Sequence, residues 1–361
     1  MDLTKLKFEI NNDRDYGTPG ESYYISDILD KELTELEIPE TYEGKPVGSF
    51  RPPYSAVYPN VKSIISPHSK IGLRVSSEAF PNLEKIEVQS FIGTSSGRYT
   101  VDGVLYYGNP ERKMNGLILY PPYKQGKEII LPRGTYLSDG CFSGAKYLEK
   151  IILPPDLHNI PDGAFYNVEN LKEIDIPCDV GDIGNDAFAH CHSLKKVTFH
   201  AEESYSGLAV IGGGVFNDCT SLEEIRLPST IRMTNGRLFS GCTSLKKVEG
   251  RFSGYRCVDG VMYAASMFGD LLHLYYFPAA KECENDTYQV IDEAEYIHCG
   301  AFYDTRLIKK VILPKGIHSI EDGSFSTSSS IEEIIYQGTE EDWEKIEKPG
   351  FPTEINVTFM G

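Results

Sequence analysis

The 361-residue chain has few basic side chains and no long apolar run. Lys and Arg number 35 against 53 Asp and Glu, which gives a formal net charge of −18 at pH 7. A nucleic-acid-binding surface needs clustered Lys and Arg to neutralise phosphates, whereas basic side chains here alternate with acidic ones. No run approaches the ~20 apolar residues of a membrane helix. The composition therefore argues against a nucleic-acid partner and against a membrane span.

Motifs that carry chemistry are scarce. The chain has no His-Glu-x-x-His and no Gly-x-Gly-x-x-Gly, and Gly212-Gly213-Gly214 fills a repeat turn. His190-Cys191-His192 gathers three possible metal ligands, but no second cluster follows at ligand spacing. Carboxylate pairs such as Glu223-Glu224 occupy strand positions that carry Lys in other copies. We therefore expect no enzyme activity, no cofactor and no metal site.

The eight cysteines do not form a disulfide pattern. Cys191, Cys219 and Cys242 each follow a phenylalanine by three residues, and Cys141 takes the place that alanine holds in neighbouring copies. Such positions suit small buried apolar side chains. We expect reduced cysteines, so cysteine usage does not identify the redox compartment.

One pattern of about two dozen residues returns through the middle of the chain. Its first half reads Leu-x-x-Ile-x-Leu-Pro, as at Leu148–Pro154, and its second half ends in Gly-Ala-Phe, as at Gly163–Phe165. The leucines at 148, 171, 194, 222 and 245 are 23 residues apart (171 − 148 = 23), except for one step of 28 (222 − 194 = 28). The phenylalanines at 142, 165, 188, 216 and 239 keep the same steps. Two markers with one period indicate a repeat protein.

The alternation of apolar and polar residues in the first half is typical of a half-buried strand, and the Pro ends its ladder. A single unit cannot bury its apolar face, but stacked copies can. The sequence therefore predicts a β-rich repeat solenoid. Its strand positions Ile151, Ile174, Val197, Ile225 and Val248 should stack in adjacent parallel strands of one sheet. Its rings should form a buried ladder of Phe165, Phe188, Phe216 and Phe239.

The exposed third strand position alternates in sign through Lys150, Glu173, Lys196, Glu224 and Lys247. Opposite charges on neighbouring strands contribute roughly 0.2–1 kcal/mol each, and like charges would cost a similar amount. This pattern favours a solvated charge ladder that keeps the register over a charged ligand site.

The repeat resembles the leucine-rich repeats of bacterial BspA-like proteins, in which the strand half is followed by Ile-Gly-x-x-Ala-Phe-x-x-Cys. Ile183–Cys191 matches that second half, and Ile211–Cys219 nearly does. The chain lacks the Asn or Cys that the commoner leucine-rich repeat places two residues past the strand Pro. The resemblance implies a right-handed leucine-rich-repeat superhelix with a parallel sheet. It also implies a bacterial cell-surface or secreted protein that mediates protein–protein interaction or adhesion.

We expect one solenoid over residues 1–361, with a hairpin cap at 1–32, repeats at 33–336 and a C-terminal cap at 337–361. Hairpin insertions interrupt the repeats near 98–122 and 255–278 and are copies of each other, because Val101-Asp102-Gly103-Val104 returns as Val258-Asp259-Gly260-Val261. The segment 339–346 has an N-capping Thr, early acids and the only Trp of the chain. It predicts a capping helix.

The location stays open, because no apolar signal-peptide segment follows Met1. The protein is cell-surface or secreted if an export signal has been removed, and cytoplasmic if Met1 is the natural start.

Two sets of residues are candidates for ligand binding. The exposed fifth strand positions follow no charge rule, and their mixture of acid, hydroxyl and base suits a recognition patch. Tyrosines cluster in the hairpin units, and exposed tyrosines contact proteins and sugars well. The predicted binding residues are Asp175, Thr198, Arg226, Glu249, Tyr106 and Tyr263. The predicted partner is a protein or a host-matrix surface ligand. The alternatives are a carbohydrate-binding surface protein and an intracellular protein-interaction scaffold.

Overall fold

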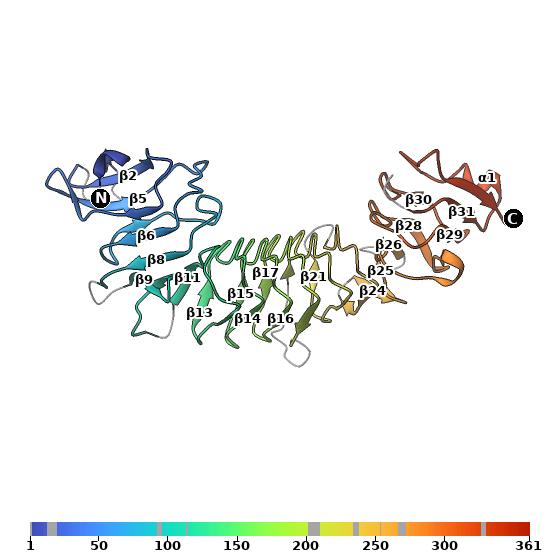
Figure 1. The fold of residues 1–361 in the computed structure, drawn as a ribbon. Coiled ribbons are helices and arrows are strands. Elements are labelled where there is room, and N and C mark those ends of the chain that lie inside the picture. Colours follow the sequence, from blue (N-terminus) through green and yellow to red (C-terminus); the bar gives the residue numbers. More distant parts are fainter. Residues whose placement is uncertain are drawn as a thin grey trace. The chain divides into compact units, whose positions relative to one another are not determined.

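The computed structural model describes residues 2–12, 20–91, 96–112, 115–200, 210–233, 238–252, 254–265, 272–325 and 330–361. It is a β-solenoid of stacked parallel strands with almost no helix (Figure 1). The chain forms two compact units, of which unit 1 holds residues 1–171 and 183–188 and unit 2 holds residues 172–182 and 189–361. Strand β17 (Asp182–Ile183) has one residue in each unit. The organisation as one continuous array remains a prediction.

Unit 1 begins with a short 3-10 helix, η1 (Leu3–Lys5), and strands follow it, joined by turns and loops. These are β1 (Leu6–Ile10), β2 (Tyr23–Ile28), β3 (Glu35–Glu37), β4 (Thr41–Tyr42), β5 (Lys45–Phe50), β6 (Ser63–Ser66), β7 (Gly72–Leu73), β8 (Lys85–Val88), β9 (Gly97–Val101), β10 (Val104–Gly108), β11 (Asn115–Leu119), β12 (Glu128–Ile130), β13 (Thr135–Leu137), β14 (Lys150–Ile152) and β15 (Asn159–Ile160).

Unit 2 contains the 3-10 helix η4 (Glu284–Asp286), the helix α1 (Glu340–Trp343) and the remaining strands. These are β16 (Glu173–Ile176), β18 (Lys196–Phe199), β19 (Val210–Ile211), β20 (Glu224–Arg226), β21 (Arg232–Met233), β22 (Lys247–Glu249), β23 (Arg251–Phe252), β24 (Tyr255–Val258), β25 (Val261–Ala265), β26 (Leu272–Tyr276), β27 (Thr287–Gln289), β28 (Ala294–Ile297), β29 (Lys310–Leu313), β30 (Ser319–Ile320), β31 (Glu333–Tyr336) and β32 (Asn356–Phe359).

The fourth strand positions pair in the predicted register and are buried. Ile174 lies opposite Val197 in the parallel pair β16–β18, and Ile225 lies opposite Val248 in β20–β22. The prediction of one sheet is wrong between β18 and β20, because β20 and β22 form a separate two-stranded sheet. This interruption coincides with the 28-residue step, whose extra residues fall largely within 201–209, outside the described residues. β18 and β20 remain in contact, but no ladder of backbone hydrogen bonds joins them.

The predicted aromatic ladder is buried. Phe165 and Phe188 stack in unit 1 with ring centroids 5.0 Å apart, and Phe216 and Phe239 stack in unit 2 at 5.9 Å. The turns before Phe165 and Phe188 need a left-handed backbone, as the φ angles of +57° at Gly163 and +51° at Asp186 show. Gly and Asp are among the few residues that adopt this conformation at low cost. Turn chemistry and core packing thus explain the same short motif.

The two hairpin insertions are antiparallel sheets that join the parallel strands. In unit 1, β9, β10 and β11 pair antiparallel, and β11 then pairs parallel with β13. In unit 2, β24, β25 and β26 repeat this arrangement, and β26 pairs parallel with β28. Both copies of the insertion therefore have one topology.

The C-terminal end differs in detail from the prediction. Thr339 caps α1 as expected, since its hydroxyl accepts a hydrogen bond from the Asp342 N–H at 3.2 Å, and Trp343 is buried. The helix has only one turn. After it, β32 pairs parallel with β31, a strand that we did not predict from the sequence.

Candidate functional site

The third strand positions form the predicted ladder of opposite charges. Glu173 lies opposite Lys196, and Glu224 lies opposite Lys247. Further along unit 2, Lys310 lies opposite Glu333 with their charged atoms 2.7 Å apart. The second strand positions carry similar pairs that the sequence analysis missed, including Lys246–Glu223 at 2.9 Å. Both rows support the register of the strands.

The four fifth-position candidates lie on the outer sheet face of unit 2 in two pairs. Asp175 lies opposite Thr198, and its carboxylate is 3.8 Å from the imidazole of His200. Arg226 lies opposite Glu249 on β20 and β22. The side chains of Asp175 and Arg226 are exposed, and those of Thr198 and Glu249 are half-buried. The structure therefore brings each pair together at the surface.

Arg226 and Glu249 also line a hollow of about 490 Å³ beside the second hairpin insertion, together with Lys247, Cys257 and Asp259. A hydrogen bond from the Lys247 ammonium lowers the pKa of the Glu249 carboxyl. Burial raises the pKa of the Cys257 thiol to about 12, so the thiol stays protonated at neutral pH. The hollow offers fixed charges and no activated nucleophile.

On β12 and β14 of unit 1 the fifth strand positions are apolar, whereas β3 and β8 carry Glu37 and Glu87 there. Ile130 on β12 lies directly opposite Ile152 on β14, and their exposed fractions are 66% and 37%. The pair Glu128–Lys150 lies beside them, and Lys127 and Glu149 form an ion pair at 2.6 Å. An apolar centre within a charged rim is typical of a protein-binding surface. The repeat motif at Leu148–Pro154 contained this signal, because Ile152 stands where the next three copies carry Asp175, Thr198 and Arg226.

The hairpin tyrosines occupy different environments. Tyr106 on β10 stacks on Tyr99 of β9 at 5.6 Å, is 8% exposed and lines a cavity of about 290 Å³. Tyr263, its counterpart in unit 2, is fully buried and its hydroxyl lies 2.6 Å from that of Tyr288. The core position of Tyr263 removes it from the set of surface contact residues, because its ring and hydroxyl are both used internally.

The outward-facing aromatic residues of the hairpins are neighbours of the predicted ones. Tyr107 is exposed on β10, and exposed Tyr136 of β13 lies with its ring over Gly116 of β11. Tyr107 and Tyr136 share Gly116 as strand partner, which places them two strands apart on one face. In unit 2, His273 stacks on Tyr296 at 4.7 Å. Strand alternation is the signal that distinguishes Tyr107 from Tyr106.

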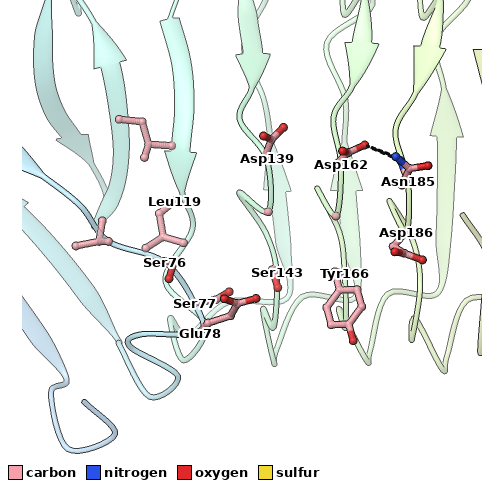
Figure 2. Close-up of a pocket in the computed structure, with 14 residues that line it drawn as sticks. Ser76, Ser77, Glu78, Leu119, Asp139, Ser143, Asp162, Tyr166, Asn185 and Asp186 are labelled. Atoms are coloured by element: carbon pink, nitrogen blue, oxygen red, sulfur yellow. Dashed lines mark hydrogen bonds between the residues drawn. The ribbon is translucent and has the colours of Figure 1, made fainter. Parts of the chain in front are cut away.

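A groove of about 460 Å³ follows the turns of unit 1 (Figure 2). Asp139, Asp162 and Asn185 are repeat equivalents on successive coils, and Tyr166 lies lower in the groove. The Asp162 carboxylate accepts a hydrogen bond from the Asn185 backbone N–H at 2.6 Å. This carboxylate therefore holds neighbouring turns together, and an acidic row of this kind does not by itself indicate a ligand.

Cysteine and histidine positions fit structural roles. Cys141, Cys191, Cys219 and Cys242 are buried, as predicted, and all eight cysteines are free thiols. His190 lies 3.3 Å from the Asp218 carboxylate. Within the ranges that the structure describes, no three His, Cys, Asp or Glu side chains are arranged to hold a metal ion.

A further spacing, Gly93-Thr94-Ser95-Ser96-Gly97, fits the Gly-x-Ser-x-Gly pattern of hydrolase nucleophiles. That pattern requires a strand, a sharp turn and then a helix. Gly97 instead begins β9, an antiparallel strand of the hairpin insertion. Residues 93–95 lie outside the described residues, and the described segment that follows them is a strand rather than the helix of a nucleophile elbow.

The architecture is that of a leucine-rich-repeat solenoid. Residues 135–253 and 278–356 match the family described as the BspA type leucine rich repeat region, in six copies. The chain therefore belongs to the BspA-type leucine-rich-repeat family, and proteins of this fold are generally non-catalytic. No curated protein sequence gives a significant match.

Solved structures of bacterial leucine-rich-repeat proteins are similar to this chain. One from Eubacterium ventriosum has 24% identity and a TM-score of 0.52, covering 82% of this chain and 65% of its own, which supports the fold. A leucine rich cell surface protein from Faecalibacterium prausnitzii has 16% identity and a TM-score of 0.47, covering 95% and 96%. A leucine-rich repeat protein from Bacteroides ovatus has 18% identity and a TM-score of 0.46, covering 99% and 98%.

The described part of the chain contains no helix of the length and apolar character that a membrane span needs.

Proposed function

We propose that this protein is a non-catalytic binding protein of the bacterial cell surface or extracellular space, where it docks a protein partner in adhesion. The observation that carries the proposal is the variation at the fifth strand positions. The parallel register there is regular, yet the side chains vary from strand to strand. Ile130 and Ile152 are paired on β12 and β14, acid, hydroxyl and base follow on β16, β18 and β20, and Ile312 and Ile335 are again paired on β29 and β31. Core packing does not determine the identity of these surface residues. Their variation is therefore consistent with selection for binding a partner.

The isoleucine pair is the stronger of the candidate contacts. Burying an exposed Ile stabilises a complex by about 25 cal/mol per Å² of apolar area, and the surrounding ion pairs supply a polar rim. The side chains of Thr198 and Arg226 in unit 2 add a hydroxyl and a guanidinium, and Arg is enriched at interfaces. Membership of the BspA-type family supports the surface location.

The docking proposal is tested by biolayer interferometry of the immobilised full chain against purified extracellular-matrix proteins. For any matrix protein that binds, we expect Ile130→Ser with Ile152→Ser, or Thr198→Ala with Arg226→Ala, to weaken binding at least tenfold, about 1.4 kcal/mol. Tyr54→Ala, at a residue that is 87% exposed elsewhere in unit 1, is the matched control. Circular dichroism confirms that each variant is folded. Unchanged affinity in both double variants would refute docking through the strand face.

The location is tested separately. Intact cells of the source bacterium are treated with protease, and the protein is detected with a specific antibody. Digestion on intact cells, or recovery from the medium, is the expected result. Full protection until the cells are lysed would instead support an intracellular scaffold.

A further inference from the structure

The cavity of about 290 Å³ in unit 1 lies between the first hairpin insertion and the parallel strand that follows it. Tyr99 of β9, Tyr106 of β10 and Asn115 of β11 line it from the hairpin side, and Ile129 of β12 lines it from the other side. Ile129 is only half-buried, although Ile151, its strand partner at the same repeat position, is 3% exposed. The cavity thus replaces the tight packing that the repeat has at the next strand.

Several polar groups of this lining have no internal partner. The hydroxyl groups of Tyr99, Tyr106, Tyr120 and Thr135 make no hydrogen bond among the described residues; these side chains are mostly buried, but their hydroxyl oxygens are not among the fully buried atoms. The Asn115 Oδ1 is also buried without a partner there, while its Nδ2 donates to the Arg112 carbonyl at 2.9 Å. Buried polar groups in folded proteins are normally paired. The buried Asn115 Oδ1 is an exception to this rule, and the accessible hydroxyls beside it converge on the same cavity, as polar groups of ligand pockets do.

The second hairpin insertion provides an internal comparison, because it has the same topology in unit 2. Tyr263 corresponds to Tyr106, and both copies keep an ion pair at the turn, Lys124–Asp102 at 2.8 Å and Lys281–Asp259 at 2.9 Å. Strands β12 and β27 each pair with the strand of the next plain coil. Tyr288 on β27 therefore takes the place of Ile129.

This exchange of side chains closes the equivalent space. The Tyr288 ring is buried, packs edge-on against Phe277 at 4.7 Å, and its hydroxyl bonds to that of Tyr263 at 2.6 Å. In the second insertion the rings of Tyr263 and Tyr288 fill the interior, and their hydroxyl groups hydrogen-bond to each other. In the first copy Ile129 is shorter and has no polar group, so the tyrosine hydroxyls face a vacant volume.

We propose that the cavity of unit 1 binds a neutral sugar residue, such as the terminal hexose of a glycan. Tyrosine and threonine hydroxyls both donate and accept hydrogen bonds, and the Asn115 carbonyl oxygen accepts. A ring that carries several hydroxyls can pair with all of these groups at once. The volume of about 290 Å³ lies just below the roughly 300–1,000 Å³ of pockets for drug-sized ligands, which suits one ring rather than several.

The charges of the lining favour a neutral ligand. Lys124 is its cation, and the Lys124 ammonium is already paired with the Asp102 carboxylate. Glu128 adds a further carboxylate to the wall, which disfavours an anion. A purely apolar ligand would leave the hydroxyls and the Asn115 Oδ1 without hydrogen bonds, so it would bind less well than a ligand that pairs with them. This site goes beyond the proposed protein docking and does not depend on it.

The test is saturation-transfer difference NMR of the full chain with glucose, galactose, mannose, N-acetylglucosamine and N-acetylgalactosamine, followed by titration of each sugar that gives a signal. p-Cresol is included as the analogue of an aromatic side chain, and glucuronate as the charged analogue. We expect at least one neutral sugar to bind. Ile129→Tyr, which copies the closed second insertion, should weaken that binding at least tenfold.

Two further variants keep the test decisive if Ile129→Tyr does not fold. Tyr106→Phe and Tyr120→Phe each remove one hydroxyl with little change in volume, and each should weaken sugar binding several-fold. Tyr107→Ser, on the outward face of the same strand, is the matched control and should bind as the wild type does. Thr198→Ala with Arg226→Ala should also leave sugar binding intact, which separates this site from protein docking.

Three results would overturn the assignment. The first is no signal for any neutral sugar of the panel with wild-type protein. The second is binding of p-cresol or glucuronate without binding of any neutral sugar, which would show that the cavity takes a different class of ligand. The third is sugar binding that Tyr107→Ser abolishes and the two Phe variants leave unchanged, which would move the site to the outer tyrosines.

Discussion

Replacing Phe165 with Ala removes a ring that is held on both sides within unit 1. Phe165 is fully buried, and its ring stacks on Phe142 at 5.4 Å and on Phe188 at 5.0 Å, with interplanar angles of 16° and 9°. Truncation of a buried Phe costs roughly 3–5 kcal/mol, more where the void cannot collapse. Each neighbouring ring is fixed by its own coil, so we expect a loss in the upper half of this range.

The free energy of unfolding is measured by urea titration followed by circular dichroism. With a urea dependence of about 3 kcal/mol per M, a loss of about 4 kcal/mol lowers the midpoint by more than 1 M. Because repeat arrays can unfold in parts, amide exchange of β14 should be measured as well and should speed up in the variant.

Two other substitutions serve as controls for the stability loss of Phe165→Ala. Phe165→Leu keeps most of the volume and should cost less than the alanine variant, about 1–2 kcal/mol. Tyr54→Ala removes an exposed ring whose partner is the Arg74 guanidinium at 4.4 Å, and should cost no more than about 1 kcal/mol. A loss below about 1 kcal/mol for Phe165→Ala would show that stacking through the Phe ladder does not hold the coils together.

Two further predictions concern buried ionisable groups. Burial raises the pKa of the Cys141, Cys219 and Cys242 thiols, so they should react slowly with Ellman's reagent in the native protein; denatured, unreduced protein should give all eight thiols, and fewer would reveal disulfides. Burial raises the pKa of Tyr99 and Tyr106 from 10.0 to about 12. Unfolded tyrosine ionises first as the pH rises, so this stability is complete below pH 10 and is lost as the pH approaches 12. Tyr106→Phe should lose less stability than wild type between pH 9 and 11, and an equal loss would contradict this.

The sequence predicted the features on which every coil depends. The period of the leucines located the strands, and the period of the phenylalanines located the buried rings, because these residues act through local geometry and stacking. The break between β18 and β20 could not be predicted in the same way. The 28-residue step was visible, but whether the extra residues interrupt strand pairing depends on the path of the longer connection.

The cavity of unit 1 was harder to predict from the sequence. Ile129 fits the repeat pattern, so the sequence does not identify it as a residue that lines a cavity. The cavity exists because the Ile129 side chain is too small to fill it, whereas Tyr288 fills the equivalent volume in the second insertion. The orientation of Tyr106 is set by the hairpin, where the register of β10 and β11 shifts between Leu105 and Tyr106. β32 was missed because Asn356–Phe359 alternates in polarity but lacks the opening leucine and the closing proline.

The alternating charge ladder has a consequence for how such a protein can change its length. Adjacent strands carry opposite charges, as in Glu173–Lys196, Glu224–Lys247 and Lys310–Glu333. Loss of the coil that carries Lys196 would make two glutamates neighbours in sequence order, and like charges opposite each other cost about as much as unlike charges contribute, roughly 0.2–1 kcal/mol. Loss of two consecutive coils keeps the alternation. Gene duplications and deletions in this family should therefore be tolerated best when they add or remove coils in even numbers.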